Sequence, residues 1–312
     1  MSMHNANVVD YKAGLIATAG SYIIWGVLPV YWKVLGHRSA DEILAHRIIW
    51  CFVFSILLVL ILHKKDQFLL QAKHMLQHKK AMMLLLSASL LISINWMLYI
   101  WMVNNERIVE ASLGYYINPL ISVLLGMIIL HERLHKLQWI SFLLAFTGVL
   151  YLTISFGSVP WMALTLAISF GLYGLAKKRS RFDAITSLTM ETVIVFPFAL
   201  LYIIYGNANG DFSFLSSSPR DIVLLIGSGI ATATPLILFA YGAQRIPLFM
   251  LGFLQYIAPT ISLLIGTVFY EESFTQDHAV AFTFIWSALL LFSLSNTKWV
   301  QQKYKRANGH TT

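Results

Sequence analysis

A stretch of nineteen residues occurs twice in this chain, once in each half. Residues 116–134 (YINPLISVLLGMIILHERL) return as residues 256–274 (YIAPTISLLIGTVFYEESF), with identical residues at eight of the nineteen positions. The identities include a Tyr, a Pro, a Ser, a Gly and a Glu in the same order, as at Pro119 and Pro259. An ordered match of such residues is hard to obtain from apolar composition alone, so the sequence predicts two copies of one unit.

The composition places these copies in a membrane. Hydrophobic residues make up 58% of the chain and charged residues only 12%, whereas in a soluble domain about a quarter of the residues are charged. Its apolar runs of roughly 20 residues are typical of transmembrane helices and not of barrel strands. The first run follows one positive charge, Lys12, and carries no cleavage site, so we expect a retained helix rather than a signal peptide. Cys51 is the single cysteine, which excludes an intramolecular disulfide and a cysteine-based metal site.

Five hydrophobic spans are predicted in each copy, with residues 1–157 forming the first copy and 158–312 the second. The predicted fold class is an all-α integral membrane protein with ten transmembrane helices. An odd number of spans per copy turns the second copy upside down relative to the first, as in many secondary transporters, so we expect two inverted five-helix repeats around a central cavity. The expected spans are residues 13–34, 43–62, 81–103, 108–130, 137–156, 159–176, 184–205, 222–243, 246–270 and 279–294.

The distribution of positive charge predicts the orientation. Seventeen Lys and Arg residues fall on the side that carries both termini, Lys177 among them, and five fall on the other. Because loops rich in Lys and Arg stay in the cytoplasm, both termini are predicted to be cytoplasmic. The net charge of +8 then reports topology and favours anionic membrane lipid, and a nucleic-acid partner need not be invoked.

The segment between the second and third spans has a pattern of its own. Apolar residues from Phe68 to Leu76 fall at helical spacing among Lys73, Lys79 and Lys80. This pattern predicts a short amphipathic helix on the cytoplasmic surface, with a solvated linker as the alternative.

Ionisable residues within the spans are candidates for a functional site, because charge inside lipid is costly. Arg47 lies about one turn into the second span and Glu191 about two turns into the seventh. Laying the copies over one another places these two residues opposite each other, so we predict an Arg47–Glu191 pair or a shared polar site. In the alternative interpretation, Arg47 reaches the headgroups and Glu191 bonds a neighbouring helix.

Aromatic and amide residues at matched depth predict a binding cavity. The run 95–107 (NWMLYIWMVNNER) corresponds to 233–245 (ATPLILFAYGAQR) in the second copy, with Trp101 matched by Phe239. Such side chains suit an amphipathic, ring-containing solute, although tryptophans near span ends more often mark the membrane interface. The candidates are Trp25, Asn95, Trp96, Tyr99 and Phe239.

The matched prolines predict paired helix breaks. A proline inside a span frees a backbone carbonyl and bends the helix, and alternating-access proteins build their sites at such bends. We therefore expect Pro119 and Pro259 to interrupt the fourth and ninth helices beside the cavity. The neighbouring candidates for solute binding are Tyr116, Asn118, Gln255 and Tyr256.

Nothing in the sequence strongly supports an enzyme. It has no Walker loop, no H-E-x-x-H motif and no cluster of cysteine ligands, and we expect neither a cofactor nor a metal. Without a nucleotide site, transport would have to use a solute or ion gradient.

Five segments also resemble a known family: DEILAHRIIW (41–50), NWMLYIWMVN (95–104), EASLGYYINPL (110–120), HERL (131–134) and LQYIAPT (254–260). In this order they resemble the RarD branch of the EamA proteins in the drug/metabolite transporter superfamily. The resemblance implies a protein of the bacterial cytoplasmic membrane with ten helices in two inverted repeats. The family label refers to chloramphenicol sensitivity, which does not fix the cargo, and the resemblance adds no site residues.

The sequence favours a secondary transporter that moves a small metabolite or drug-like solute by alternating access. Helices one, three, four, six, eight and nine are expected to line the cavity. The principal rival is a membrane enzyme or lipid-handling protein with a head-group site at Arg47 and Glu191, and a membrane scaffold is the third hypothesis. The cargo, the direction of transport, the coupling ion and the oligomeric state do not follow from the sequence.

Overall fold

The computed structural model describes residues 3–105, 107–210, 212, 214, 217–271 and 275–295, and these residues form helices without any strand. Glu272 and Phe274, which belong to the second copy of the repeated stretch, lie outside the described residues. The helices are α1 (Met3–Val34), α2 (Ala40–Ile61), α3 (Lys65–Gln77), α4 (Lys79–Asn104), α5 (Ile108–Ile129), α6 (Lys136–Ser155), α7 (Trp161–Arg179), α8 (Ala184–Asn209), α9 (Pro219–Ala243), α10 (Leu248–Gln255), α11 (Ile257–Phe269) and α12 (Gln276–Ser295).

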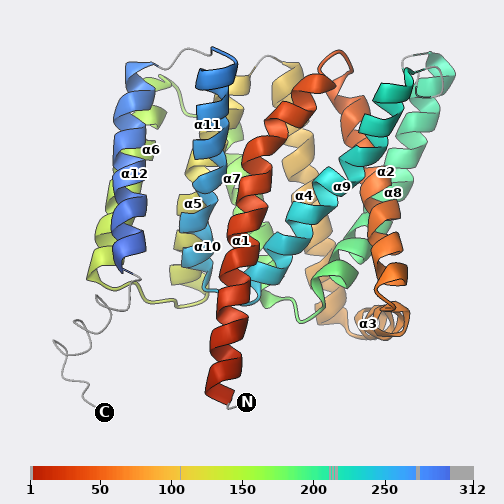
Figure 1. Ribbon diagram of the computed structural model, residues 1–312, viewed down its shortest axis with the longest axis horizontal. Helices are drawn as coiled ribbons and strands as arrows, with labels where there is room; N and C mark the ends of the chain where they lie inside the picture. The colour runs from red at the N-terminus through yellow and green to blue at the C-terminus, as the bar shows by residue number, and fades with distance from the viewer. Residues whose placement is uncertain are drawn as a thin grey trace.

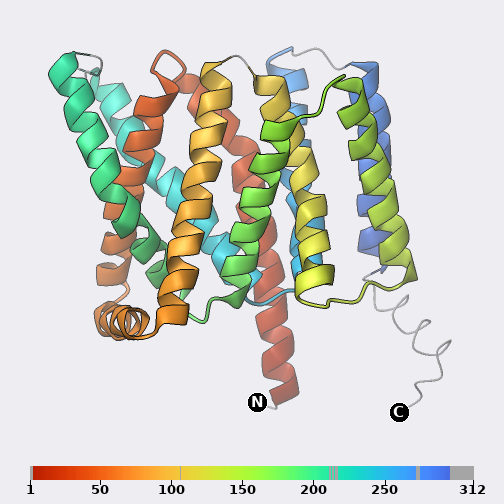
Figure 2. The same cartoon turned by 180° about the vertical axis from the view of Figure 1, so that it is seen from behind.

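Nine helical segments of the described chain are long and apolar enough to cross a membrane. They are α1 from Asp10 onward, α2, α4, α5, α6, α8, α9, the pair α10 and α11 together, and α12. The sixth expected span, α7, is long enough at 19 residues but is not among them, because Lys177, Lys178 and Arg179 in its last turn lower its mean hydropathy. It nevertheless runs beside α4 and α5 in the same layer as the long helices (Figure 2).

The first helix begins and the last helix ends on the same face of the bundle, at the bottom of Figure 1. We call this the N-terminal face and the other the opposite face. The helix α3 lies along the N-terminal face, roughly across the direction of the long helices (Figure 1). The amphipathic helix expected there is confirmed, and the alternative of a solvated linker is wrong. Met75 is buried while Leu70 and Leu76 are exposed, so α3 directs one apolar side chain inward.

Helices from the two halves of the chain are interleaved. The helix α5 packs against α7 and α10, and α1 packs against α9 and α11. In turn, α2 lies between α8 and α9, while α6 pairs with α12 at one end of the bundle (Figure 1). Neither half therefore forms a separate body, because every helix except α3 has its principal contacts with helices of the other half.

Glycines allow the closest of these contacts. A Cβ added at Gly114 of α5 would lie 2.8 Å from the side chain of Leu166 and 3.1 Å from the carbonyl of Ala163, both on α7. A Cβ at Gly252 of α10 would lie 2.7 Å from the carbonyl oxygen of Pro119 on α5. Membrane helices associate through such small residues because lipid supplies no hydrophobic driving force between them.

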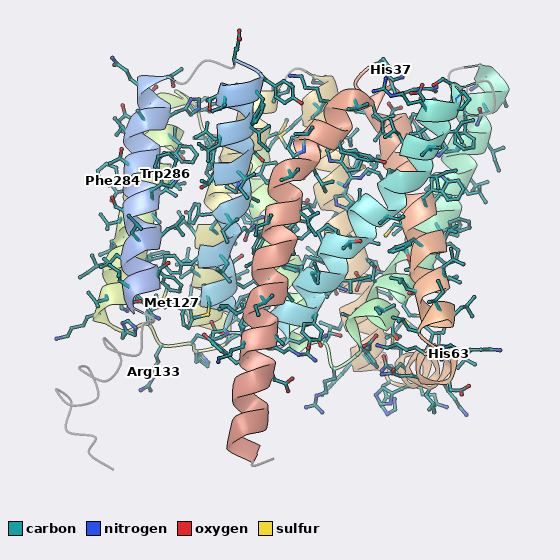
Figure 3. All side chains as sticks on the ribbon, viewed as in Figure 1. His37, His63, Met127, Arg133, Phe284 and Trp286 are labelled. Atoms are coloured by element: carbon teal, nitrogen blue, oxygen red, sulfur yellow. The ribbon has the colours of Figure 1, made fainter. Side chains whose placement is uncertain are left out.

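Large apolar side chains cover the outside of the bundle as well as its interior. Ile16, Leu201 and Phe269 are 72%, 65% and 76% exposed, which would be unfavourable for a protein surrounded by water. Polar side chains gather at the two ends instead, as His37 does at the opposite face and His63 and Arg133 at the N-terminal face (Figure 3). This banded surface fits a bundle embedded in lipid.

The two matched prolines do not have the same effect. The helix α5 continues through Pro119 without interruption, so the helix break predicted there is wrong. In the second copy the helix divides at Tyr256, three residues before Pro259, where the N–H of Tyr256 donates to the carbonyl of Phe253 at 3.3 Å. Pro259 has no N–H to offer the carbonyl of Gln255, and only this copy converts the missing hydrogen bond into a break.

Candidate functional site

A cavity of about 280 Å³ lies among the helices of both halves. Aromatic side chains form most of its wall, and a few polar groups from α2, α4, α5, α9 and α10 face it. Nine of the predicted residues line it: Trp25, Arg47, Asn95, Trp96, Tyr99, Tyr116, Asn118, Gln255 and Pro259.

The other residues of the wall were not among the sequence candidates. They are Tyr22, Leu28, Pro29, Trp32, Ser112, Tyr115, Phe170, Thr232, Leu236, Ala258 and Ser262. One signal was available for α1, because Tyr22, Trp25, Pro29 and Trp32 recur at intervals of three and four residues and so share a helical face. The position of Trp32 near the span end favours the interface instead, and only the tertiary structure, in which α1 and α2 both pack against α9, places its ring over Arg47.

The cavity occupies the half of the bundle near the opposite face. On α1 the wall extends to Trp32, two residues before the helix ends at Val34. On α5 it begins at Ser112, about one turn after the helix starts at Ile108. Both of these helix ends lie at the opposite face (Figure 1).

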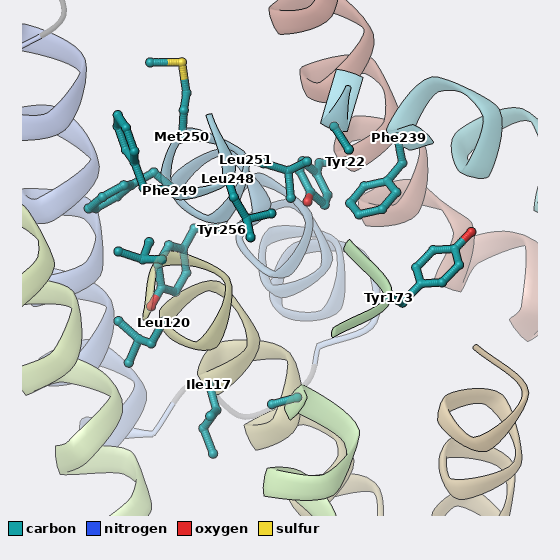
Figure 4. Close-up of a cluster of buried hydrophobic side chains, with 14 of the residues drawn as sticks. Tyr22, Ile117, Leu120, Tyr173, Phe239, Leu248, Phe249, Met250, Leu251 and Tyr256 are labelled. Carbon is teal, nitrogen blue, oxygen red and sulfur yellow. The ribbon is translucent and has the colours of Figure 1, made fainter. Parts of the chain in front are cut away.

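A cluster of rings closes the cavity toward the N-terminal face. Phe239 of α9 is fully buried and its ring centroid lies 5.7 Å from that of Trp25, 5.3 Å from that of Phe170 and 5.9 Å from that of Tyr173. Figure 4 shows Phe239 between Tyr22 and Tyr173. We call Tyr22, Trp25, Phe170, Tyr173 and Phe239 the aromatic plug. Phe239 was predicted to face the solute, but it lies one turn beyond the lining residue Leu236, within the plug.

Arg47 is the cation of the cavity wall. Its Nε donates a hydrogen bond to Oγ1 of Thr232 at 3.1 Å. Its guanidinium carbon lies 4.5 Å from the ring centroid of Trp32 and 5.6 Å from that of Trp96. Attraction to the two ring faces compensates part of the cost of desolvating the charge.

Three amides take part in the wall in different ways. The amide nitrogen of Asn95 is already used within the protein, since its Nδ2 donates to the carbonyl of Leu166 at 2.8 Å and to Oγ of Ser169 at 3.1 Å. Gln255 accepts a long hydrogen bond of 3.5 Å from Ser122. The Oδ1 atom of Asn118 is buried and has no hydrogen-bond partner among the described residues. Asn118 is therefore the amide of the wall whose acceptor the described protein leaves unused.

The predicted Arg47–Glu191 pair is wrong. Glu191 on α8 forms a buried ion pair with Lys177 on α7, and it accepts further hydrogen bonds from Ser187 at 2.9 Å and Tyr173 at 3.3 Å. Glu191 faces α7, whereas Arg47 faces α9, so the two charges find different partners. Glu191 lines a separate small cavity between α4, α7 and α8, and the two residues form no shared head-group site.

Lys177 is the charged residue that sequence reasoning misplaced. The charge count assigns it to a cytoplasmic loop, but α7 continues to Arg179 and the side chain of Lys177 is only 1% exposed. In the sequence Lys177 is followed directly by Lys178 and Arg179, so all three read as one basic loop and the position of Lys177 inside the helix is not apparent. Removing it from the count leaves sixteen positive charges against five, so the predicted orientation does not change.

Two other candidates lie beside the cavity without lining it. Tyr256 is 1% exposed, and its hydroxyl donates to the carbonyl of Tyr116 at 3.3 Å, which ties the break in the second copy to α5. Pro119 packs against Gly252 within the same contact. Their contribution is to position α5 against α10.

Comparison with known proteins assigns the chain to a family. The model of the EamA-like transporter family matches it twice, over residues 12–154 and 158–294. The chain belongs to the EamA-like transporter family. It is 48% identical to the uncharacterized transporter YojE of Bacillus subtilis over 93% of this chain and 96% of that protein. It is 41% identical to the protein RarD of Escherichia coli over 90% of this chain and 94% of that protein.

These relatives confirm the resemblance to the RarD branch. Family and relatives indicate a multi-pass membrane transporter, rather than an enzyme, and a small-molecule solute as its partner. A solved crystal structure is similar to the fold with a TM-score of 0.69, at 17% identity, and covers 92% of this chain and 99% of that chain. At this identity the likeness is one of fold alone.

Proposed function

We propose that this member of the EamA-like transporter family is a secondary transporter that moves a small metabolite or drug-like solute by alternating access. The observation that carries the proposal is a cavity confined to one half of the bundle and closed toward the other half by the aromatic plug. A solute bound above Phe239 would meet one face of the membrane, and rearrangement of the plug would open the route to the other.

The proposed architecture is ten transmembrane helices in two inverted repeats, residues 1–157 and 158–312, with α7 as the sixth span. It is supported by helix contacts that recur when each helix is replaced by its equivalent in the other copy. The contact of α5 with α7 corresponds to that of α11 with α1, and the contact of α1 with α9 corresponds to that of α7 with α4. The helices expected to be equivalent, α2 and α8, pack on each other, and their matched rings Phe52 and Phe196 lie 4.5 Å apart.

Flux through reconstituted protein tests this function. Proteoliposomes are loaded with a deproteinised extract of small cellular metabolites, and mass spectrometry follows which compounds leave relative to protein-free vesicles. We expect one chemical class to leave unaltered and at a rate proportional to the amount of protein. Equal release from both kinds of vesicle would contradict the proposal, and recovery of chemically altered lipid would favour the lipid-handling rival.

The proposed location is the cytoplasmic membrane of a bacterium, with the N-terminal face in the cytoplasm. Lys73 on α3 and Asn209 at the end of α8 are exposed on opposite faces, and the native Cys51 is fully buried. In intact cells, an impermeant thiol reagent should therefore label Asn209→Cys and leave Lys73→Cys unlabelled. The unmodified chain provides the blank. Labelling at position 73 without labelling at 209 would reverse the orientation.

The unequal prolines predict opposite shifts in the alternating cycle. If the break at Tyr256 belongs to the state described above, Pro259→Ala restores an N–H that can close the helix and should disfavour this state. Pro119→Ala should favour it, because by inversion α5 would break in the other state. The readout is labelling of Ser112→Cys, in the cavity wall, from each side of the membrane in a Cys51→Ala background. Equal labelling in both proline variants would reduce the prolines to packing roles.

A further inference from the structure

Arg47 has a hydrogen-bonding capacity that the described protein does not use. A guanidinium group carries five N–H donors, and the described residues supply one acceptor, Thr232, which bonds Nε. Trp32 and Trp96 approach the guanidinium as rings, so they do not accept hydrogen bonds along its outer edge. The two terminal nitrogens therefore keep their donors for something else in the cavity.

The charge of Arg47 is also without an acidic partner in the described part of the chain. Its titratable neighbours are Tyr99 and Tyr115 in the same cavity wall and Cys51 one turn further along α2, and none of them carries a carboxylate. Glu191 is bound to Lys177, and the acidic residues of the opposite face bond elsewhere, as Glu42 and Asp221 do with Arg38. Arg47 is partly buried among the helices, where a cation without a counter-ion is costly, and an arriving anion would offset that cost.

The residues around Arg47 indicate the shape, polarity and size of the ligand that the cavity could bind. Thr232 fixes Nε, which orients the guanidinium plane before a solute binds. Aromatic rings from α1, α4, α5 and α7 supply flat apolar walls, and the cavity of about 280 Å³ limits the solute to a small molecule. Guanidinium binds carboxylate, sulfonate and phosphate groups through two parallel N–H donors.

We infer that the cavity selects small amphipathic anions, with the acidic group held by Arg47 and an aromatic or other flat apolar body held between the rings. The inference rests on the proposed function, because it names the solute class of the same cavity. A lipid headgroup would present the same anionic chemistry, so the test has to separate a free solute from a lipid.

The test is equilibrium binding by purified protein in phosphatidylcholine nanodiscs, followed by quenching of tryptophan fluorescence. The probes are 2-naphthalenesulfonate, an anion at all accessible pH values, and 2-naphthalenesulfonamide, a neutral molecule of nearly the same shape. The wild type should bind the anion about tenfold to a hundredfold more tightly than the amide, as expected for hydrogen bonds to a charged group. Arg47→Gln should abolish this preference and leave the affinity for the amide unchanged.

Two further variants keep the result interpretable. Arg47→Lys keeps the charge without the planar pair of donors and should retain part of the preference, even if Arg47→Gln does not fold. Arg107→Gln is the matched control, since Arg107 is about half exposed, pairs with Glu110 and lies outside the cavity wall. It should bind both probes like the wild type.

Several outcomes would overturn the inference. These are equal binding of the two probes by the wild type, absence of sulfonate binding, or a preference that persists in Arg47→Gln. Loss of sulfonate binding when phosphatidylglycerol replaces part of the phosphatidylcholine would assign Arg47 to a lipid headgroup and overturn it as well. This assay measures binding and not flux. If the anion does not bind but flux depends on the protein, the proposed transport function holds and only the anion inference fails. If the anion binds and no flux is found, only the proposed transport function is contradicted.

Discussion

Phe239→Ala should open the cavity toward the N-terminal face and destabilise the protein. The ring of Phe239 contacts rings of α1 and α7, so its removal leaves a void in the middle of the aromatic plug. Loss of a buried phenylalanine from a packed core costs about 3 kcal/mol or more of unfolding free energy. In addition, an impermeant thiol reagent supplied at the N-terminal face should label Ser112→Cys far faster in Phe239→Ala than in the parent, both in a Cys51→Ala background.

Phe253→Ala is the matched control for this prediction. Phe253 is also buried, but it lies on α10 and stacks on Phe292 with centroids 3.9 Å apart, away from the plug. It should lose a similar amount of stability without any change in the labelling of Ser112→Cys. Equal labelling rates for the two variants would mean that Phe239 is ordinary packing and that the cavity is closed elsewhere.

Glu191→Ala should be the most destabilising single change at a charged residue of the bundle core. Among the described residues it leaves the buried ammonium group of Lys177 with Ser187 as its one remaining hydrogen-bond partner, at 3.0 Å. Breaking a buried ion pair from one side costs about 3–5 kcal/mol, because the remaining charge is uncompensated. Unfolding of the purified protein by denaturing detergent measures the loss of stability.

A double substitution separates the pair from its members. Lys177→Met with Glu191→Met removes both charges while nearly keeping the volume, and it should recover most of the stability that Glu191→Ala loses. Lys64→Ala is the control for a more exposed pair, since Lys64 and Asp183 are 30% and 23% exposed, and its cost should be about 0–1 kcal/mol. Strictly additive effects of the two methionine substitutions would contradict the pairing.

Much of the fold could be predicted from the sequence because lipid imposes simple requirements. The need to satisfy every backbone group inside a membrane turns a long apolar run into a helix, so nine spans and the amphipathic α3 were found from composition and periodicity. The repeated stretch was visible because its Tyr, Pro, Ser, Gly and Glu are informative residues in an apolar background. Even the small set of intramembrane charges and aromatics pointed to this cavity, since Arg47 and Trp96 both line it.

The sequence by itself determined that this chain is a helical membrane protein of two related halves, and it supplied nine of the residues that line the cavity. Only the tertiary structure decided which charges meet, because the direction of a side chain around its helix depends on the neighbour against which the helix packs. Glu191 thus meets Lys177 and not Arg47. The structure also decided that a helix break accompanies Pro259 but not Pro119. A helix that lacks one backbone hydrogen bond can stay continuous or break, and the contacts around it decide which.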